Sequence, residues 1–116
     1  MNLDAFLQRI RNGETIDFQE TLSVIAQHYQ YQPTEFSNGL NKPLLNPAGS
    51  NEGSCKIFSF AKLHNLTQKQ TLALFGDYYL KDVLHHPDGS DHMNIRNFMR
   101  DGWEGIQFQG MALKAN

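Results

Sequence analysis

Residues 50–66, SNEGSCKIFSFAKLHNL, predict the central helix of the fold. Their apolar side chains fall on more than one face at helical spacing, and a helix that is apolar on several sides is normally buried. Ser54 is a candidate N-cap, and Asn65 suits the left-handed position that closes a helix. We therefore expect other elements to pack around this segment. The apolar residues are Ile57, Phe58, Phe60, Ala61 and Leu63.

Two amphipathic helices are predicted before this segment. The first has apolar residues at helical spacing over Leu3–Ile10 and ends at Gly13, which tolerates the closing conformation. The second begins with Asp17 and Glu20, whose spacing is that of a capping box, and should run to about Gln30. Both helices have one apolar face for the core.

A fourth helix is predicted directly after the central one. Thr67 and Gln70 form a second capping box, so this helix starts almost at once. Pro87 disfavours helical backbone angles at His86, and we expect the helix to end there. Two helices joined this tightly must turn sharply on each other.

A fifth helix follows a turn at residues 88–89, Asp-Gly. Ser90 or Asp91 is expected to accept the free amides at its start. The pair Gly102–Trp103 closes this helix and should bring the indole ring onto Phe98. The chain between the fourth and fifth helices thus has a structural explanation in turn and capping chemistry.

Strands are expected in two places. Three prolines and several glycines and asparagines exclude a helix between residues 32 and 51, where a short strand over residues 34–37 is predicted with a tight turn at Asn38–Gly39. Ile106 and Phe108 alternate with glutamines, as in a strand with one wet face. The sequence therefore predicts an α+β fold that is mainly helical, with about five helices and a small antiparallel sheet.

Length and composition predict one domain over residues 1–116. The formal net charge is −2, with both signs scattered, so we expect neither nucleic acid nor membrane as a partner. Cys55 is the only cysteine and cannot form an internal disulfide, which favours the cytoplasm, and we expect the chain to be a monomer. No apolar export segment is evident, although specialised secretion systems read amino-terminal segments without such a signature.

Cys55 is the sharpest chemical candidate. It should lie in the first turn of the central helix, where unpaired amides and the helix dipole favour a thiolate, and Lys56 is its neighbour. With His92 as the base it would support a small cysteine-dependent hydrolase or transferase. A free cysteine is also among the most buried residue types, and the sequence favours that structural role.

Residues 85–96, HHPDGSDHMNIR, hold three of the five histidines beside two aspartates. Their spacing matches none of the usual zinc patterns, and turn and capping duties account for the aspartates. We therefore predict no metal and no cofactor here. The expected role of the segment is to end one helix and start the next.

An anion site is a further alternative. His92, Arg96 and Arg100 are four residues apart and align on one face of the fifth helix. With His86 and Asp91 they are the candidate ligand-binding residues for a small molecule or a protein partner. Solvated surface charges would explain the same residues.

A ligand pocket, if the aromatic residues line one, is expected at one particular place. This is the meeting point of the start of the central helix, the turn over residues 85–92 and the proline-rich segment. A packed aromatic core is the alternative use of these side chains.

Four stretches together resemble the HopJ family, a group of bacterial proteins identified as type III effectors. They are NEGSCKIFSFAKLH, TLALFGDYYLKDVL, HPDGSDHMNIRNFMRDGW and GIQFQGMAL. The resemblance covers residues 38–113, and before it the chain is similar only in its helical pattern. It implies secretion into host cells as one expectation and supplies no catalytic residue set, so a resident role in the producing cell and an undetermined activity are equally implied.

Overall fold

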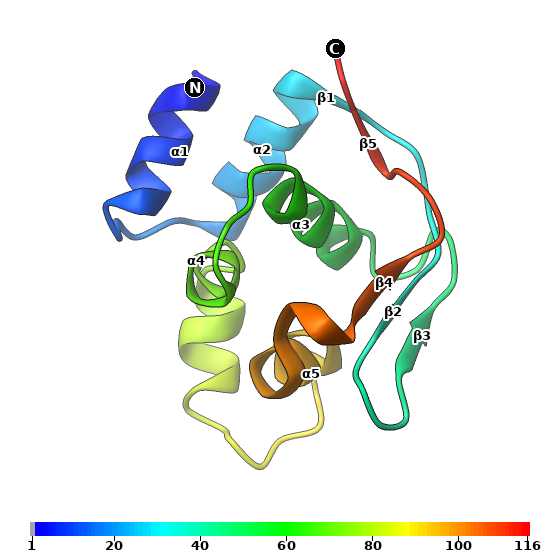
Figure 1. The fold of residues 1–116 in the computed structure, drawn as a ribbon. Coiled ribbons are helices and arrows are strands. Elements are labelled where there is room, and N and C mark those ends of the chain that lie inside the picture. The colour runs from blue at the N-terminus through cyan, green and yellow to red at the C-terminus, as the bar shows by residue number, and fades with distance from the viewer. Residues whose placement is uncertain (1) are drawn as a thin grey trace.

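The structure, a computed structural model, describes residues 2–116, and its central element is the helix α3, Glu52–Leu63 (Figure 1). Six of its twelve residues are buried, as expected for a helix that is apolar on several sides. Asn65 adopts the predicted left-handed conformation after its end. The predicted N-cap is wrong, because Asn51 enters the helix with φ 51° and Ser54 lies within the first turn.

The two amino-terminal helices form as predicted, with one correction. They are α1, Leu3–Arg11, and α2, Phe18–His28, and the capping box at the start of α2 is complete. The second helix ends two residues before Gln30. The reason is that β1, Tyr29–Tyr31, pairs antiparallel with β5, Leu113–Ala115, a strand that the sequence did not predict.

A three-stranded antiparallel sheet confirms the predicted small sheet. Its strands are β2, Phe36–Asn38, β3, Leu44–Asn46, and β4, Ile106–Phe108, in the order β3-β2-β4. The predicted tight turn at Asn38–Gly39 is wrong. Asn38 is the last residue of β2 and is fully buried, and residues 39–43 form a wider connection.

The predicted fourth helix is broken. It consists of α4, Gln68–Ala73, a turn, and a π-helical segment η1, Tyr78–Val83. Gly76 lies between them with φ 59°, and a Cβ atom there would come within 2.8 Å of the backbone nitrogen of Phe18. The break is therefore needed because the chain passes directly against the start of α2.

The last helix, α5, spans Met93–Asp101 and continues into a 3₁₀ turn, η2, Gly102–Gly105. The Trp103 ring lies 5.1 Å from that of Phe98, as predicted, and its indole nitrogen donates to the Leu66 carbonyl over 3.1 Å. Neither Ser90 nor Asp91 caps the helix. His92 takes the N-cap position in a left-handed conformation instead.

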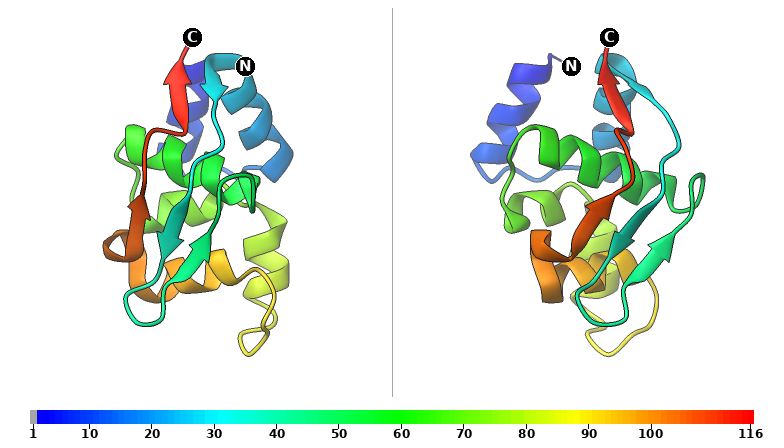
Figure 2. Two further views of the ribbon diagram at one scale, coloured as in Figure 1. Left: turned by 90° about the vertical axis from the view of Figure 1, so that its right-hand side faces the viewer. Right: turned by 45° about the vertical axis from the view of Figure 1, so that its right-hand side comes forward.

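The strands run along one side of the molecule and the helices fill the other (Figure 2). The two termini lie at the same end of the fold (Figure 1). The Phe58 ring of α3 contacts rings from β2, the turn after α4, α5 and η2, which makes it the centre of the core. The fold is α+β and mainly helical, as predicted, and within residues 2–116 no helix is long and apolar enough to cross a membrane.

Candidate functional site

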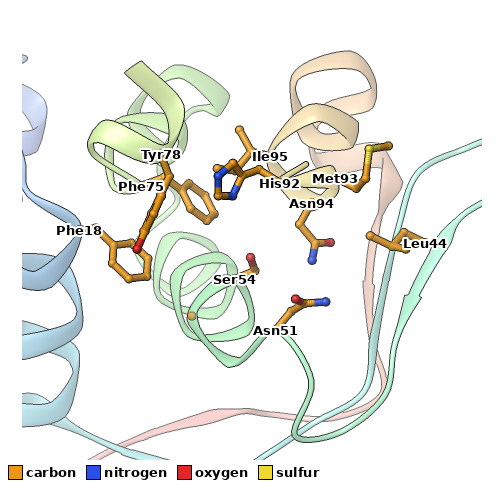
Figure 3. A pocket seen from close by; sticks show the side chains of 11 residues that line it. Phe18, Leu44, Asn51, Ser54, Phe75, Tyr78, His92, Met93, Asn94 and Ile95 are labelled. Carbon is orange, nitrogen blue, oxygen red and sulfur yellow. The ribbon is translucent and has the colours of Figure 1, made fainter. Parts of the chain in front are cut away.

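A cavity of about 510 Å³ lies where the start of α3, the start of α5 and strand β3 meet. This is the place that the sequence predicted for a pocket. Its walls are mainly apolar, and none of its eleven lining residues is an Asp, Glu, Lys or Arg. The lining residues are Phe18, Leu44, Asn51, Gly53, Ser54, Phe75, Tyr78, His92, Met93, Asn94 and Ile95 (Figure 3).

Two helix N-termini open into this cavity without side-chain caps. Asn51 precedes α3 and His92 precedes α5, both with φ and ψ near +50°, and neither helix start has a capping side chain. The first intrahelical bonds come from the amides of Cys55, at 3.0 Å, and Arg96, at 3.1 Å. The earlier amides are therefore unpaired within each helix.

The consequence is a local excess of positive partial charge. Free amides and the helix dipole both favour an anion at a helix start. A left-handed residue followed by a right-handed one also turns successive N–H groups into one concavity, a nest that binds anions. Two such starts face one cavity here. No carboxylate lines the cavity itself, although Glu52 lies in the first turn of α3 and Asp82 and Asp91 lie beside His92.

His92 is held in a fixed orientation at this cavity. Its Nε2 lies 3.1 Å from a carboxylate oxygen of Asp82 on η1, and its ring is 5.1 Å from that of Tyr78. When Nε2–H donates its hydrogen bond to Asp82, the neutral ring carries its lone pair on Nδ1. The second carboxylate nearby, Asp91, is 3.8 Å from the same Nε2.

Ser54 projects into the same space from the first turn of α3, and His92 and Asn94 project into it from α5 (Figure 3). Ser54 is partly exposed. The preceding residue, Gly53, has no side chain because a Cβ there would lie 2.9 Å from the Phe18 ring. The glycine thus lets an aromatic wall approach the helix start.

Buried asparagines fix the two helix starts relative to each other. Asn46 on β3 accepts from the side-chain amides of Asn51, at 2.7 Å, and Asn94, at 2.8 Å. Its own amide donates to Asn94 over 3.1 Å. Asn46 and Asn94 are both buried. Hydrogen bonds in such a low-dielectric environment are strong when made and costly when broken, so they hold the two side chains in one geometry. The network joins the N-cap of α3 to the first turn of α5.

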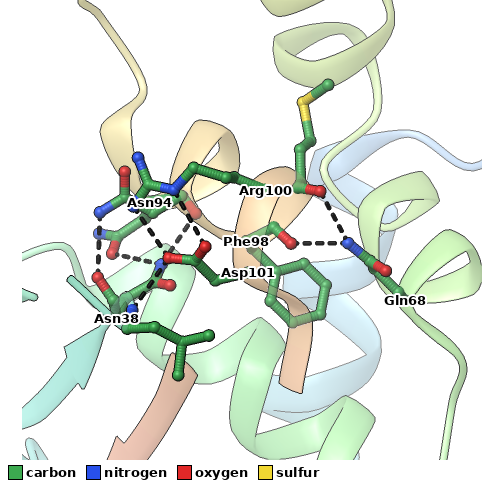
Figure 4. Close-up of polar contacts among 9 residues, drawn as sticks. Asn38, Gln68, Asn94, Phe98, Arg100 and Asp101 are labelled. Carbon is green, nitrogen blue, oxygen red and sulfur yellow. Dashed lines mark hydrogen bonds and ion pairs between the residues drawn. The ribbon is translucent and has the colours of Figure 1, made fainter. Parts of the chain in front are cut away.

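The same network continues to strand β2 and along α5 (Figure 4). The Asn38 side chain donates to the backbone and side-chain oxygens of Asn94, and Asn97 donates to the Asn38 carbonyl over 3.0 Å. At the other end of α5, the Gln68 amide donates to the carbonyls of Phe98 and Met99. Helix α5 is therefore held at both ends.

The structure places Cys55 away from the cavity. Its side chain is buried, and the thiol donates to the Thr34 carbonyl over 3.5 Å. Burial raises the pKa of the thiol, so the helix dipole does not produce a thiolate here. Among residues 2–116 no hydrogen bond joins Cys55 to His92.

The predicted anion ligands do not gather around the cavity, apart from His92. The Arg96 guanidinium donates to Asp91, at 2.7 Å, and to the backbone carbonyls of His86, at 2.8 Å, and of Asp91 itself. It holds the connection over residues 85–92 in shape. Arg100 pairs with the adjacent Asp101 over 2.8 Å, and this guanidinium holds the pKa of Asp101 below its usual value.

The described part of the chain contains no cluster of metal-ligating side chains. Within residues 2–116, no three His, Cys, Asp or Glu side chains are grouped so that they could hold an ion.

Sequence reasoning missed several residues of the site. Ser54 was assigned to capping, and Asp82, Asn46 and Asn94 were not singled out. The exposed His-Asp pairing could not be found by spacing, because Asp82 and His92 lie on different elements. Asparagine is frequent near turns, so the sequence could suggest that these asparagines lie close to the ends of elements. The hydrophobic pattern did not indicate that they are buried.

The fold and the site define a small α+β protein with a cavity between two uncapped helix N-termini. The family model of the HopJ type III effector protein matches residues 3–113, so the chain belongs to the HopJ family. The match includes the amino-terminal helices, where the sequence had shown only a similar helical pattern.

Among solved structures, the chain is similar to the crystal structure of VPA0580, described as a protein of unknown function. The TM-score is 0.95 at 49% identity, over 100% of this chain and 95% of the other. A search of curated proteins gave no match. The comparisons therefore establish family and fold and leave the activity undetermined.

Proposed function

We propose that this protein binds a small anionic molecule with an apolar part in the cavity between α3 and α5. The observation that carries the proposal is the convergence of two uncapped helix starts on one cavity lined by neutral residues. The amides would hold a carboxylate or phosphate group. The aromatic and aliphatic walls would hold the rest of the ligand.

The expected affinity is moderate. A charge at one helix start is stabilised by about 0.3–1 kcal/mol when exposed and up to about 2 kcal/mol when partly buried. Two helix starts plus a few hundred Å² of buried apolar ligand surface at about 25 cal/mol per Å² would offset the entropy of binding. Dissociation constants between roughly 1 mM and 1 μM are therefore expected.

Two other assignments have weaker support. The arginine site around Arg96 and Arg100 has its cations already paired with Asp91 and Asp101. The thiol of Cys55 is buried, so a cysteine-dependent hydrolase would need the helix start to open. The cavity beside His92 requires no such rearrangement.

Calorimetric titration with matched small molecules tests the proposal. Phenyl phosphate and phenylacetate should bind at least about tenfold more tightly than benzyl alcohol, which has no charge. His92→Gln should weaken both anions, whereas Arg100→Gln, a cation outside the cavity, should change neither. Equal binding of the neutral compound, or an equal loss in Arg100→Gln, would contradict the proposal.

The cellular setting is proposed from family membership. A HopJ chain is expected to be made in the bacterial cytoplasm as a monomer and to be exported by a type III system, with a small molecule rather than nucleic acid or membrane as its partner. A reporter fused to residues 1–30 tests the export step. Retention of that reporter in the producing cell would indicate instead that the protein acts inside the bacterium that makes it.

A further inference from the structure

We propose that the cavity hydrolyses carboxylic esters, with Ser54 as nucleophile, His92 as general base and acid, and Asp82 as the residue that positions His92. This inference rests on the proposed function, because the amides that bind the anion would also hold the oxyanion of the reaction. It goes beyond binding by assigning the site a reaction and three roles.

The first support is the pair formed by His92 and Asp82. A histidine that acts on a hydroxyl needs its other ring nitrogen bonded to a carboxylate, which fixes the tautomer and stabilises the imidazolium. The distance of 3.1 Å from Nε2 to Asp82 meets this requirement. The Tyr78 ring beside the imidazole limits its rotation, and Nδ1 is the ring nitrogen that the bond to Asp82 leaves free to act as the base.

The second support is the position of Ser54. It is the third residue of α3, and it lines the cavity together with His92. Its neighbour Cys55 points into the core, so the hydroxyl rather than the thiol is the nucleophile that the helix presents to the cavity. At a helix start, the dipole stabilises an alkoxide and the oxyanion that follows it.

The Ser54 side chain must turn toward His92 for the reaction. Among the described residues no hydrogen bond joins the two side chains. Rotation of a serine hydroxyl about one bond is easily accessible, and catalytic hydrogen bonds commonly tighten when a substrate binds.

The reaction is balanced within the residues named. The Ser54 oxygen attacks the acyl carbon and passes its proton to His92 Nδ1, and the amides at the helix starts bind the oxyanion. The alcohol leaves with the proton from His92, which gives an acyl-serine. Water then attacks that ester and gives one proton to His92, which passes it to the Ser54 oxygen as the carboxylic acid is released, and the acid ionises to the carboxylate in solution.

The size and walls of the cavity indicate the substrate class. A volume of about 510 Å³ lined by aromatic rings suits esters of small aliphatic or aromatic acids. The carboxylate product is an anion of the kind that the proposed function assigns to the site. Phosphonofluoridates, which trap activated serines, are the matching covalent probes.

The test is to label the full chain with an alkyl phosphonofluoridate and to map the adduct by peptide mass spectrometry, alongside hydrolysis of p-nitrophenyl acetate. Label is expected on Ser54 alone. Ser54→Ala and His92→Gln should each lower kcat/KM about 100-fold or more. Ser90→Ala, an exposed serine outside the cavity, should leave both readouts unchanged.

Asp82→Asn separates positioning from a structural effect. It should lower kcat more than it raises KM and should change the pH profile of kcat, because the histidine loses its carboxylate partner. Label on Cys55, or no label and no hydrolysis in a protein that still binds phenylacetate, would overturn the catalytic roles and leave the binding proposal standing. Loss of phenylacetate binding as well would overturn both.

Discussion

The helix starts of this protein fall into two groups. Asn2 caps α1, Asp17 with Glu20 forms a complete box on α2, and Thr67 with Gln70 forms another on α4. The helices α3 and α5 have left-handed N-cap residues and no capping side chain. The two groups also differ in location, because both uncapped starts line the cavity, whereas the capped starts contribute only the Phe18 ring of α2.

The difference supports the proposal that the free amides are kept for a ligand. A capping side chain is worth about 1 kcal/mol, and a histidine in the left-handed region costs about 1–2 kcal/mol. The protein forgoes this stability at two neighbouring positions and nowhere else among its α-helices in residues 2–116. Local rules are most often broken at functional sites.

The largest effect is expected from the asparagine that joins the two uncapped starts. Asn46→Ala should lower the free energy of unfolding by about 2–4 kcal/mol, because it leaves the buried side chain of Asn94 without its partner and removes the bond that holds Asn51. Urea unfolding measures the loss, and anion binding should weaken at the same time. Asn41→Ala, an exposed amide in the connection between β2 and β3, should stay within about 0.5 kcal/mol of wild type.

A pair of substitutions separates stability from binding. Asp17→Ala removes the cap of α2 and should cost about 1 kcal/mol while phenyl phosphate still binds. His92→Gly relieves the left-handed strain and loses only a partly exposed ion pair, so stability should change little while binding weakens because the imidazole wall of the cavity is gone. The distinction between capped and uncapped helix starts would be contradicted if both variants lowered stability equally or weakened phenyl phosphate binding equally.

Supplying a carboxylate to an uncapped start should be stabilising. Ser54→Asp places a negative charge beside the free amides of α3 and should raise the free energy of unfolding by about 0.3–1 kcal/mol. It should also abolish anion binding, because the charge occupies the site. Ser54→Asn is the neutral control, and a destabilised Ser54→Asp would show that the cavity does not favour an anion.

The smallest expected effect is a pH dependence of the free energy of unfolding that comes from Glu20 in the capping box of α2. Hydrogen bonds from Arg9 and from the Asp17 amide hold the pKa of Glu20 below its usual value. A depressed carboxyl pKa adds stability above the unfolded pKa, near 4.3, and loses it as the pH falls through the folded value.

The difference in unfolding free energy between wild type and Glu20→Gln should therefore be constant from about pH 5 to 7 and shrink toward pH 3. Denaturant titrations at each pH measure it. A difference that grows on acidification would contradict the assignment of Glu20 to the cap.

Local patterns predicted most of the fold. The capping boxes of α2 and α4 and the apolar faces of α3 are determined by residues three or four positions apart, so a single sequence reveals them. The break at Gly76 and the strand β5 could not be predicted in this way. Each depends on a distant segment, the start of α2 for the glycine and β1 for the strand.

The site was predicted in its place but only partly in its residues. The meeting of three segments follows from their order and from loop positions, and His92 was among the candidates. Cys55 and Ser54 show the limit, because adjacent residues on a helix point about 100° apart. Which of them faces the core depends on how α3 is rotated, and the packing around Phe58 determines that rotation.

Nuclear magnetic resonance of backbone amides during a titration with inorganic phosphate tests the central claim most directly. The amides of Gly53 and Ser54 on α3 and of Met93 and Asn94 on α5 should shift together and saturate with one dissociation constant. Those of Gln19 and Gln70 at the capped starts should not move. Shifts confined to residues around Arg96 and Arg100, or equal shifts at capped and uncapped starts, would contradict it.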